Sequence, residues 1–450
     1  MRKRRRSFKL HKGQLAIWND INVPDPPREV VIAAGARWGK DRFCLLAMLS
    51  MALRMLNQER ERRERAKLIP LVLCWYVAPT YGLLRQAWDE LKTIASAWDF
   101  VKLNESEKRC YLKGGAIQIE FKSADRPNLL LARGLDLVVI TEAARIKEDA
   151  LTLAIMQRLA SPLRGFGGNG GLLIMNSTPN GKNWYYKRFL DAKAGKGNAR
   201  AYHYTSFDNP LINPNEILRQ KAILPEYAYR QEFLAEFVSR EGAVFKDIEK
   251  ALECYQFPQA EDDFSDIARY FIGVDWGREN DRTAVSVVRW EGDICRLISF
   301  RLLDRIAFDQ QIDTILRIAS DYPTAEIISE KNGIGLSLTE QLKAEASNKV
   351  TAFDTTARSK PELIDKMIVL FEQGRIKLPA SPEGGYIPYM PLCAVEQLYE
   401  ELRCYECKRN ANDHYTYNAP AGMHDDCVIS LCLACCGKQV KQGAGLQGIK

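Results

Sequence analysis

The 450-residue sequence has no uninterrupted run of about 18 apolar residues, which excludes a membrane-spanning helix. It also lacks the pattern of a secretory signal, because the basic start Met1–Arg6 leads into Phe8-Lys9-Leu10-His11-Lys12 and not into an apolar core. Twelve cysteines without such a signal are typical of reduced cytosolic thiols. The sequence contains no internal repeat and no low-complexity tract. The whole sequence is 46% hydrophobic and 27% charged, which with its length indicates a globular protein of two or three domains.

Strong net charge is also missing, since the formal value of +7 is modest for this length. The basic residues are concentrated at one place, the tip Met1–Arg6. Such a tip is consistent with contact to nucleic acid or to another anionic partner, and equally with a solubilising tail. The sequence leaves both interpretations open.

One stretch is organised like a phosphate-binding loop, and it reads Ala34-Gly35-Ala36-Arg37-Trp38-Gly39-Lys40-Asp41. It follows the apolar run 30–32 and precedes apolar residues with helical spacing, from Cys44 to Leu56. A loop that ends in Gly-Lys at the start of a helix directs backbone N–H groups and a lysine toward phosphate. The standard form is G-x4-G-K-[ST], and this stretch lacks its first glycine, replaced by Ala34, and its hydroxyl, replaced by Asp41.

Further buried strands are predicted along the first half of the chain, at residues 71–77, 135–140 and 172–175. A hairpin is predicted between Tyr111 and Phe121. Strands that alternate with helices favour a mainly parallel α/β sheet, in which functional groups gather at the carboxyl ends of the strands. The polar segments after residues 32, 77, 140 and 175 all lie there.

A magnesium-binding acid and a group that activates water should accompany such a loop. The strand ending at Ile140 is followed by Thr141-Glu142, so Glu142 is the candidate base and Thr141 stands where an Asp is expected. We hypothesise that the usual pair is exchanged, with the carboxylate on the loop (Asp41) and the hydroxyl on the strand (Thr141). The alternative is a loop that has lost turnover. Arg37 is a candidate for the γ-phosphate, or else an exposed loop cation.

A second group of acids follows in the last 180 residues of the chain. Asp275 ends one predicted strand, Glu330 ends another, and Asp425-Asp426 opens an apolar helical segment. Singly, each acid is often a turn residue or a cap. Together they favour a nuclease site in which carboxylates hold two hard cations, Mg²⁺ or Mn²⁺. We place an ATPase domain at 1–245, a linker at 246–268 and a nuclease domain at 269–450.

From about Leu10 to Cys436 the chain resembles the large terminase subunits of tailed bacteriophages. Gln14 matches that family's adenine-contacting motif, and Gly35–Asp41 and Thr141-Glu142 match its Walker A and B segments, with the Walker B Asp missing. Ser177-Thr178 resembles its coupling motif. The nuclease motifs match at Asp275, Glu330 and Asp426. The resemblance implies a P-loop ATPase of the ASCE type followed by an RNase H-like nuclease.

The resemblance also implies a motor that uses ATP with Mg²⁺ to move double-stranded DNA into a procapsid, and a nuclease that cuts concatemers. Its expected partners are the portal protein, the small terminase subunit and further copies of the chain in a ring, with Arg133 as a possible arginine finger. We expect it in the cytoplasm of the infected host and not in the mature virion. Two alternatives stay open, namely a helicase-nuclease outside packaging and a non-hydrolysing prophage remnant.

Overall fold

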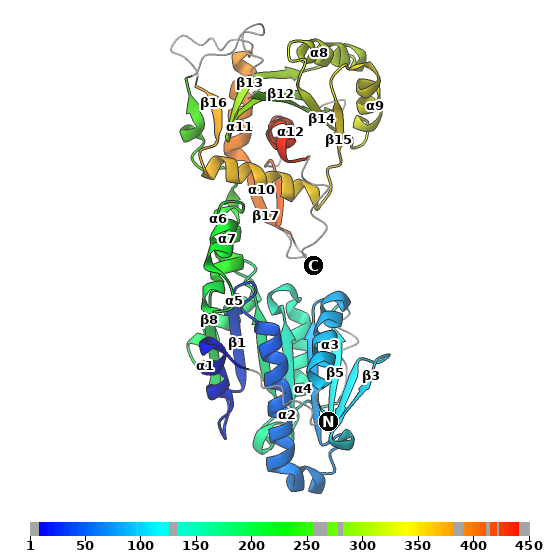
Figure 1. The fold of residues 1–450 in the computed structure, drawn as a ribbon, viewed down its shortest axis with the longest axis vertical. Coiled ribbons are helices and arrows are strands. Elements are labelled where there is room, and N and C mark those ends of the chain that lie inside the picture. Colours follow the sequence, from blue (N-terminus) through cyan, green and yellow to red (C-terminus); the bar gives the residue numbers. More distant parts are fainter. Residues whose placement is uncertain are drawn as a thin grey trace. The chain divides into compact units, whose positions relative to one another are not determined.

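The computed structural model describes residues 9–96, 98–125, 133–254, 268–277, 282–380, 390–410, 415–420 and 423–440. The chain forms two compact units (Figure 1). One contains the chain up to Ala222 together with Tyr227–Ser239, and the other contains Ile223–Glu226 together with the chain from Arg240 onward. The domain bounds 1–245, 246–268 and 269–450 stay a prediction. None of the helices within the described residues has both the length and the apolar character of a membrane span.

The N-terminal unit is built on an eight-stranded sheet in the order β3-β4-β5-β2-β6-β7-β1-β8. All neighbouring strands from β5 to β8 are parallel, and only β3 and β4 add antiparallel pairs. The strands are β1 (Glu29–Ala34), β2 (Val72–Ala78), β3 (Val101–Asn104), β4 (Arg109–Leu112), β5 (Ile117–Ser123), β6 (Leu137–Thr141), β7 (Leu172–Ser177) and β8 (Ala199–Tyr204). The predicted strands at 30–32, 71–77, 135–140 and 172–175 and the hairpin at 111–121 are confirmed.

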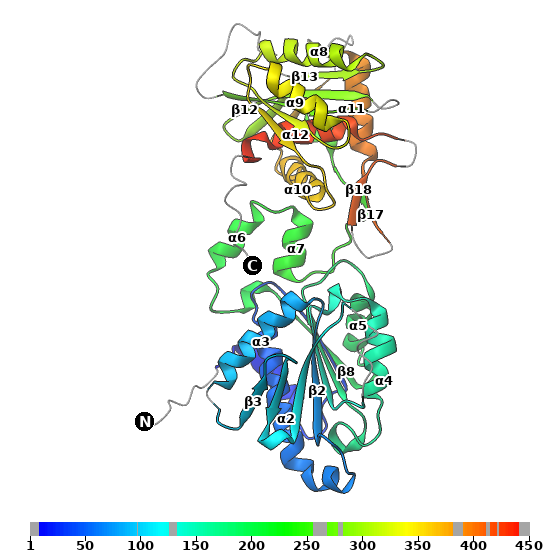
Figure 2. The ribbon, with the colours of Figure 1, turned by 90° about the vertical axis from the view of Figure 1, so that its right-hand side faces the viewer.

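Helices cover both faces of this sheet. The helices are α1 (Lys12–Ile21), α2 (Lys40–Arg65), α3 (Tyr81–Ala95), α4 (Met156–Leu159), α5 (Trp184–Lys193), α6 (Pro214–Lys221) and α7 (Glu226–Leu234). Side chains of β1 alternate between two cores, with Val30 and Ile32 packed among residues of α1, α2 and α3, and Val31 and Ala33 among residues of α4 and α5. Figure 2 shows α2 and α3 on one side and α4 and α5 on the other.

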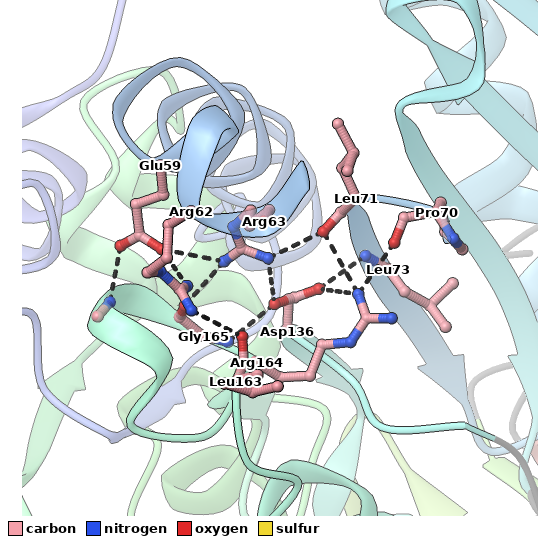
Figure 3. Close-up of polar contacts among 11 residues, drawn as sticks. Glu59, Arg62, Arg63, Pro70, Leu71, Leu73, Asp136, Leu163, Arg164 and Gly165 are labelled. Atoms are coloured by element: carbon pink, nitrogen blue, oxygen red, sulfur yellow. Dashed lines mark hydrogen bonds and ion pairs between the residues drawn. The ribbon is translucent and has the colours of Figure 1, made fainter. Parts of the chain in front are cut away.

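A buried ion cluster ties the amino end of β6 to the last turn of α2 (Figure 3). The Asp136 carboxylate, fully buried, lies 2.7 Å from Arg63 Nη1 and 2.8 Å from Arg164 Nη1. It also accepts hydrogen bonds from the backbone N–H groups of Leu73 (2.9 Å) and Gly165 (2.8 Å). With four donors on its two oxygens, the charge of Asp136 is compensated, so the cluster joins α2, β2 and the loop at residues 164–165 to the start of β6.

The C-terminal unit contains a seven-stranded sheet in the order β10-β16-β13-β12-β11-β14-β15. The pairs β11–β12 and β12–β13 are antiparallel, and the others are parallel. The strands are β10 (Leu252–Glu253), β11 (Ala268–Asp275), β12 (Thr283–Glu291), β13 (Ile294–Leu303), β14 (Glu326–Glu330), β15 (Val350–Phe353) and β16 (Ile376–Pro379). A small sheet is formed by β9 (Gly242–Ala243), β17 (Glu406–Arg409) and β18 (Tyr415–Asn418).

Two helices pack on one face of the seven-stranded sheet and one lies very close to the other face. Apolar residues of α8 (Phe308–Ser320) and α9 (Gly335–Glu345) share a core with β11, β12 and β14. On the opposite face α12 (Asp426–Val440) approaches β11 so closely that a Cβ on Gly273 would lie 2.1 Å from the carbonyl oxygen of Ser430. The remaining helices are α10 (Ser359–Glu372) and α11 (Leu392–Cys404). The start of α12 is therefore held at the carboxyl end of β11.

Candidate active sites

The phosphate loop lies at the carboxyl end of β1 and is enclosed by residues from later in the chain. Ala36 N donates to Glu232 O at 2.6 Å, and Ser206 Oγ donates to Ala36 O at 2.7 Å. A Cβ on Gly35 would lie 2.6 Å from both Phe233 O and Ser206 Oγ, so only glycine fits there. Gly39 adopts a φ of 90° before α2 begins at Lys40, which glycine alone adopts without strain.

Lys40 extends into a buried site formed by two other strand ends. Its Nζ lies 3.0 Å from Glu142 Oε1 and donates to Thr178 Oγ1 at 3.1 Å. Burial lowers the pKa of Lys40, but the Glu142 and Asp41 carboxylates raise it more, and the net shift is upward. The lysine therefore stays charged and is ready to bind an anion.

Asp41 of the loop and Thr141 of the strand end, the proposed exchanged pair, lie in direct contact. Thr141 Oγ1 donates a hydrogen bond to Asp41 Oδ1, across from the end of β6 to the first turn of α2. Asn176 Oδ1 lies 3.4 Å from the same hydroxyl. One carboxylate and one hydroxyl thus share the place where the hypothesis of an exchanged pair requires them.

The residues of the coupling motif lie between the loop strand and the Glu142 strand, because β7 separates β1 from β6. Thr178 Oγ1 accepts from Lys40 and donates to Ala34 O at 3.3 Å. Ser177 Oγ lies 3.4 Å from Glu142 Oε2. These two side chains connect the lysine and the candidate base.

The predicted adenine-contacting segment packs against the loop. Gln14, buried, donates from Nε2 to Gly39 O at 3.3 Å, and its Oε1 accepts from His11 N at 3.4 Å. Trp38 is fully buried and stacks on Tyr204 with ring centroids 5.0 Å apart. The loop is therefore rigidly attached to α1 and β8.

Two candidate arginines lie in different places. Arg37 is exposed on the loop with a φ of 60°, and its carbonyl accepts from Asn209 Nδ2 at 2.8 Å. Arg133 is at the other end of the strands, where its Nη1 donates to Ile69 O at 2.9 Å ahead of β2 and β6. A contact between Arg133 and its own phosphate loop is excluded by this placement, and a role at a neighbouring subunit stays a prediction.

The acids of the second site lie at the ends of adjacent elements. Strands β11 and β14 are parallel, with Val274 paired to Ser329, so Asp275 and Glu330 follow side by side. Burial and a hydrogen bond with Glu330, together with the charges of Asp426 and Asp425, raise the pKa of Asp275 well above its usual range. The other three carboxylates are therefore near enough to act on the charge of Asp275.

Asp425 and Asp426 are positioned by residues of α10 and α11. Lys360 Nζ lies 2.8 Å from Asp425 Oδ2, and Tyr405 Oη donates to the same oxygen at 3.2 Å. Glu401 accepts from the backbone N–H of Cys427 at 3.0 Å and so caps the start of α12.

Oxygen donors on a buried, mutually repelling set of carboxylates fit hard divalent cations such as Mg²⁺ and Mn²⁺. Within the described residues, no three His, Cys, Asp or Glu side chains already lie close enough to form a complete metal site.

Several residues of both sites were not predicted from the sequence. Arg145 Nε lies 3.6 Å from Glu142 Oε2, and the three-residue spacing was the only available signal. The loop partner Ser206 and the Asp425 partners Lys360 and Tyr405 carry no motif. Only the fold brings them to the sites.

The fold and the two sites define a class of protein, a P-loop nucleotide-binding domain joined to a domain with a cluster of carboxylates at strand ends. Residues 272–438 match the family model of the terminase RNaseH-like domain. The chain is 25% identical over 406 residues to the large terminase subunit of Thermus virus P23-45, covering 82% of this chain and 79% of that protein. It is 26% identical over 233 residues to the large terminase subunit of Escherichia phage T5, covering 50% of this chain and 51% of that protein.

The fold is also similar to solved large terminases. The structure of a large terminase from a thermophilic bacteriophage matches with a TM-score of 0.55 at 15% identity, covering 95% of this chain and 98% of that chain. Over most of its length the chain is therefore similar to the large terminase subunits of phages. The mainly parallel sheet with its phosphate loop and the RNase H-like domain predicted from the sequence are confirmed.

Proposed function

We propose that ATP with Mg²⁺ binds at the loop Gly35–Asp41 and that its hydrolysis moves double-stranded DNA into a procapsid. The observation that carries this proposal is the position of Lys40, whose ammonium lies between Glu142 and Thr178 where three strand ends meet. Support comes from the same thermophilic bacteriophage's large terminase, whose structures include complexes with ADP and with ATP-gamma-S.

Each residue of the ATPase site has a proposed role. Backbone N–H groups of the loop and Lys40 bind the phosphates, and Asp41 with Thr141 supplies the oxygens for Mg²⁺. Gln14 contacts the adenine, with Trp38 closing the loop behind it. Glu142 orients and deprotonates the attacking water, and Arg37 neutralises charge on the γ-phosphate. Ser177 and Thr178 transmit the change at Lys40 and Glu142 along β7.

In the C-terminal unit, Asp275, Glu330, Asp425 and Asp426 are proposed to hold two Mg²⁺ or Mn²⁺ ions. Paired ions about 3.5–4 Å apart stabilise both the attacking and the leaving oxygen in phosphodiester cleavage. The carboxylates of this chain fix the ions against the end of β11, and Asp275 must release its proton when they bind, because its pKa is raised.

The proposed partners are the portal protein, the small terminase subunit and further copies of the chain in a ring, in which Arg133 reaches the site of a neighbour. The proposed place of action is the cytoplasm of the infected host, at the procapsid and not in the mature virion. DNA contacts should be salt-dependent, through lysine and arginine on phosphates.

Two matched variants test the proposal in the full chain. Glu142→Gln should retain ATP binding and lose roughly 10²- to 10⁴-fold in DNA-stimulated ATP turnover, with cleavage of linear DNA retained. Asp426→Asn should show the reverse, normal turnover and no cleavage. A parent protein that binds ATP without any turnover in the presence of DNA would instead support the non-hydrolysing alternative, and normal turnover in Glu142→Gln would refute the proposed base.

A further inference from the structure

The segment that enters the C-terminal unit is built into that unit's small sheet. Directly after the first unit ends at Ser239, strand β9 pairs antiparallel with β17, with Ala243 opposite Glu406 and Gly242 opposite Cys407. Val244 N then donates to Tyr405 O at 2.9 Å. We call residues 242–245 the connector.

The last residue of the connector lies between two aromatic rings. Phe245 is 3% exposed, and its ring stacks on Tyr405 with a centroid distance of 5.8 Å and an interplanar angle of 16°. The Phe245 ring also contacts the Phe371 ring, with the two centroids 5.1 Å apart. Phe371 belongs to α10, and Tyr405 directly follows α11.

The two elements that contact Phe245 are also the two that hold Asp425. Tyr405, fully buried, directs its hydroxyl hydrogen to Asp425 Oδ2 at 3.2 Å and to Tyr417 O at 3.3 Å, and Lys360 at the start of α10 lies 2.8 Å from the same Asp425 oxygen. Asp425 immediately precedes Asp426, the first residue of α12. A continuous set of contacts therefore runs from the connector through Tyr405 to the carboxylates.

We infer that Tyr405 is a positioning residue for the nuclease, which orients Asp425 for metal binding and whose own position is set by the connector. This inference rests on the proposed metal site. Its physical basis is that groups hydrogen-bonded to a metal-binding carboxylate fix its orientation, and their loss typically lowers metal affinity about 10- to 100-fold. Because the connector pairs with β17 and packs on Tyr405, a shift of β9 should change the metal affinity.

The test measures Mn²⁺ binding to the full chain without nucleotide or DNA, from the free Mn²⁺ signal in electron paramagnetic resonance. Tyr405→Phe keeps the stacked ring and removes only the hydroxyl, and it should weaken binding about 10- to 100-fold. Phe245→Leu removes the stack and should also weaken binding. In the Tyr405→Phe background, Phe245→Leu should add no further loss, since its effect passes through the hydroxyl.

Tyr322→Leu is the matched control, because it removes a ring from another aromatic pair, which is tilted and lies 5.5 Å from Tyr270 ahead of β14. It should bind Mn²⁺ like the parent, whereas melting curves in EDTA should show comparable losses of stability in Tyr322→Leu and Phe245→Leu. Parent-like binding by Tyr405→Phe, or multiplying losses in the double variant, would overturn the inference. Asp275→Asn tests the proposed metal site separately from the positioning role of Tyr405. Unchanged Mn²⁺ binding in that variant would refute the metal site itself.

Discussion

The contact between Asp41 and Thr141 leads to a prediction about their exchange. The double variant Asp41→Ser with Thr141→Asp returns both positions to the residue types of the standard loop and keeps one carboxylate and one hydroxyl in the site. Each single variant breaks this balance. Asp41→Ser leaves two hydroxyls facing each other, and Thr141→Asp leaves two carboxylates.

The contact sets the size of each effect. A hydrogen bond to a charged group contributes about 1.5–3 kcal/mol, so Asp41→Ser should lower kcat/KM for ATP roughly 10- to 150-fold. In Thr141→Asp, two carboxylates about 4 Å apart repel by about 4 kcal/mol at an effective dielectric constant of about 20, which is about a thousandfold. The double variant has a single carboxylate again, and we expect it within about tenfold of the parent.

The assay is DNA-stimulated ATP turnover at saturating Mg²⁺, with kcat and KM determined separately. Thr141→Ser retains the hydroxyl and serves as the control, expected to turn over like the parent. If the double variant loses as much as the two single losses multiplied together, the two side chains do not share one function and the hypothesis of an exchanged pair is wrong.

Three further predictions concern other contacts. Thr178→Val removes the hydroxyl that accepts from Lys40, so stopped-flow assays should show near-normal ATP binding and turnover reduced about 10- to 100-fold. Asp136→Leu removes the carboxylate shared by the buried Arg63 and Arg164 and should cost about 3–5 kcal/mol. Calorimetry should show a melting temperature lower by roughly 6–20 °C, and an unchanged melting temperature would contradict this. The pKa of Asp275 is raised in the fold, so its protonation stabilises the metal-free protein fully below about pH 3.9, the usual pKa of an unfolded Asp. This stabilisation is lost as the pH rises through the raised pKa. In EDTA, Asp275→Asn should therefore become increasingly more stable than the parent with rising pH.

The central strands were predictable because each is a continuous apolar run that must be buried on both faces. The same logic located the polar residues at their ends, and parallel pairing then brought Lys40, Glu142 and Thr178 together. Strand β8 was not predicted because it lies at the edge of the sheet, paired with β1. Its exposed positions interrupt the apolar pattern that marks the central strands. Its place in the sheet follows from pairing with β1, about 170 residues away in sequence.

The partners of the predicted acids could not be found in the same way. Lys360 and Tyr405 are common residue types without a motif, and they are 65 and 20 residues away from Asp425 in sequence. What makes them functional candidates is the packing of α10 and α11 beside the start of α12. Local sequence patterns identify residues whose chemistry is unusual for their surroundings, and they cannot identify ordinary residues that gain a role only through long-range packing.

The pairing of Lys40 with Glu142 has a consequence for how hydrolysis is controlled. Lys40 lies 3.0 Å from one oxygen of Glu142, so the ammonium competes with a water molecule for that carboxylate. When phosphate oxygens bind Lys40, they compete with Glu142 for the same charge and free the carboxylate to orient water. Glu142 keeps a second cationic neighbour in Arg145, 3.6 Å away and more than half exposed, which holds it close to its place. The geometry therefore predicts that nucleotide binding weakens the contact between Lys40 and Glu142. The carboxylate of Asp41 also acts on the charge of Lys40 and belongs to the same set of charges.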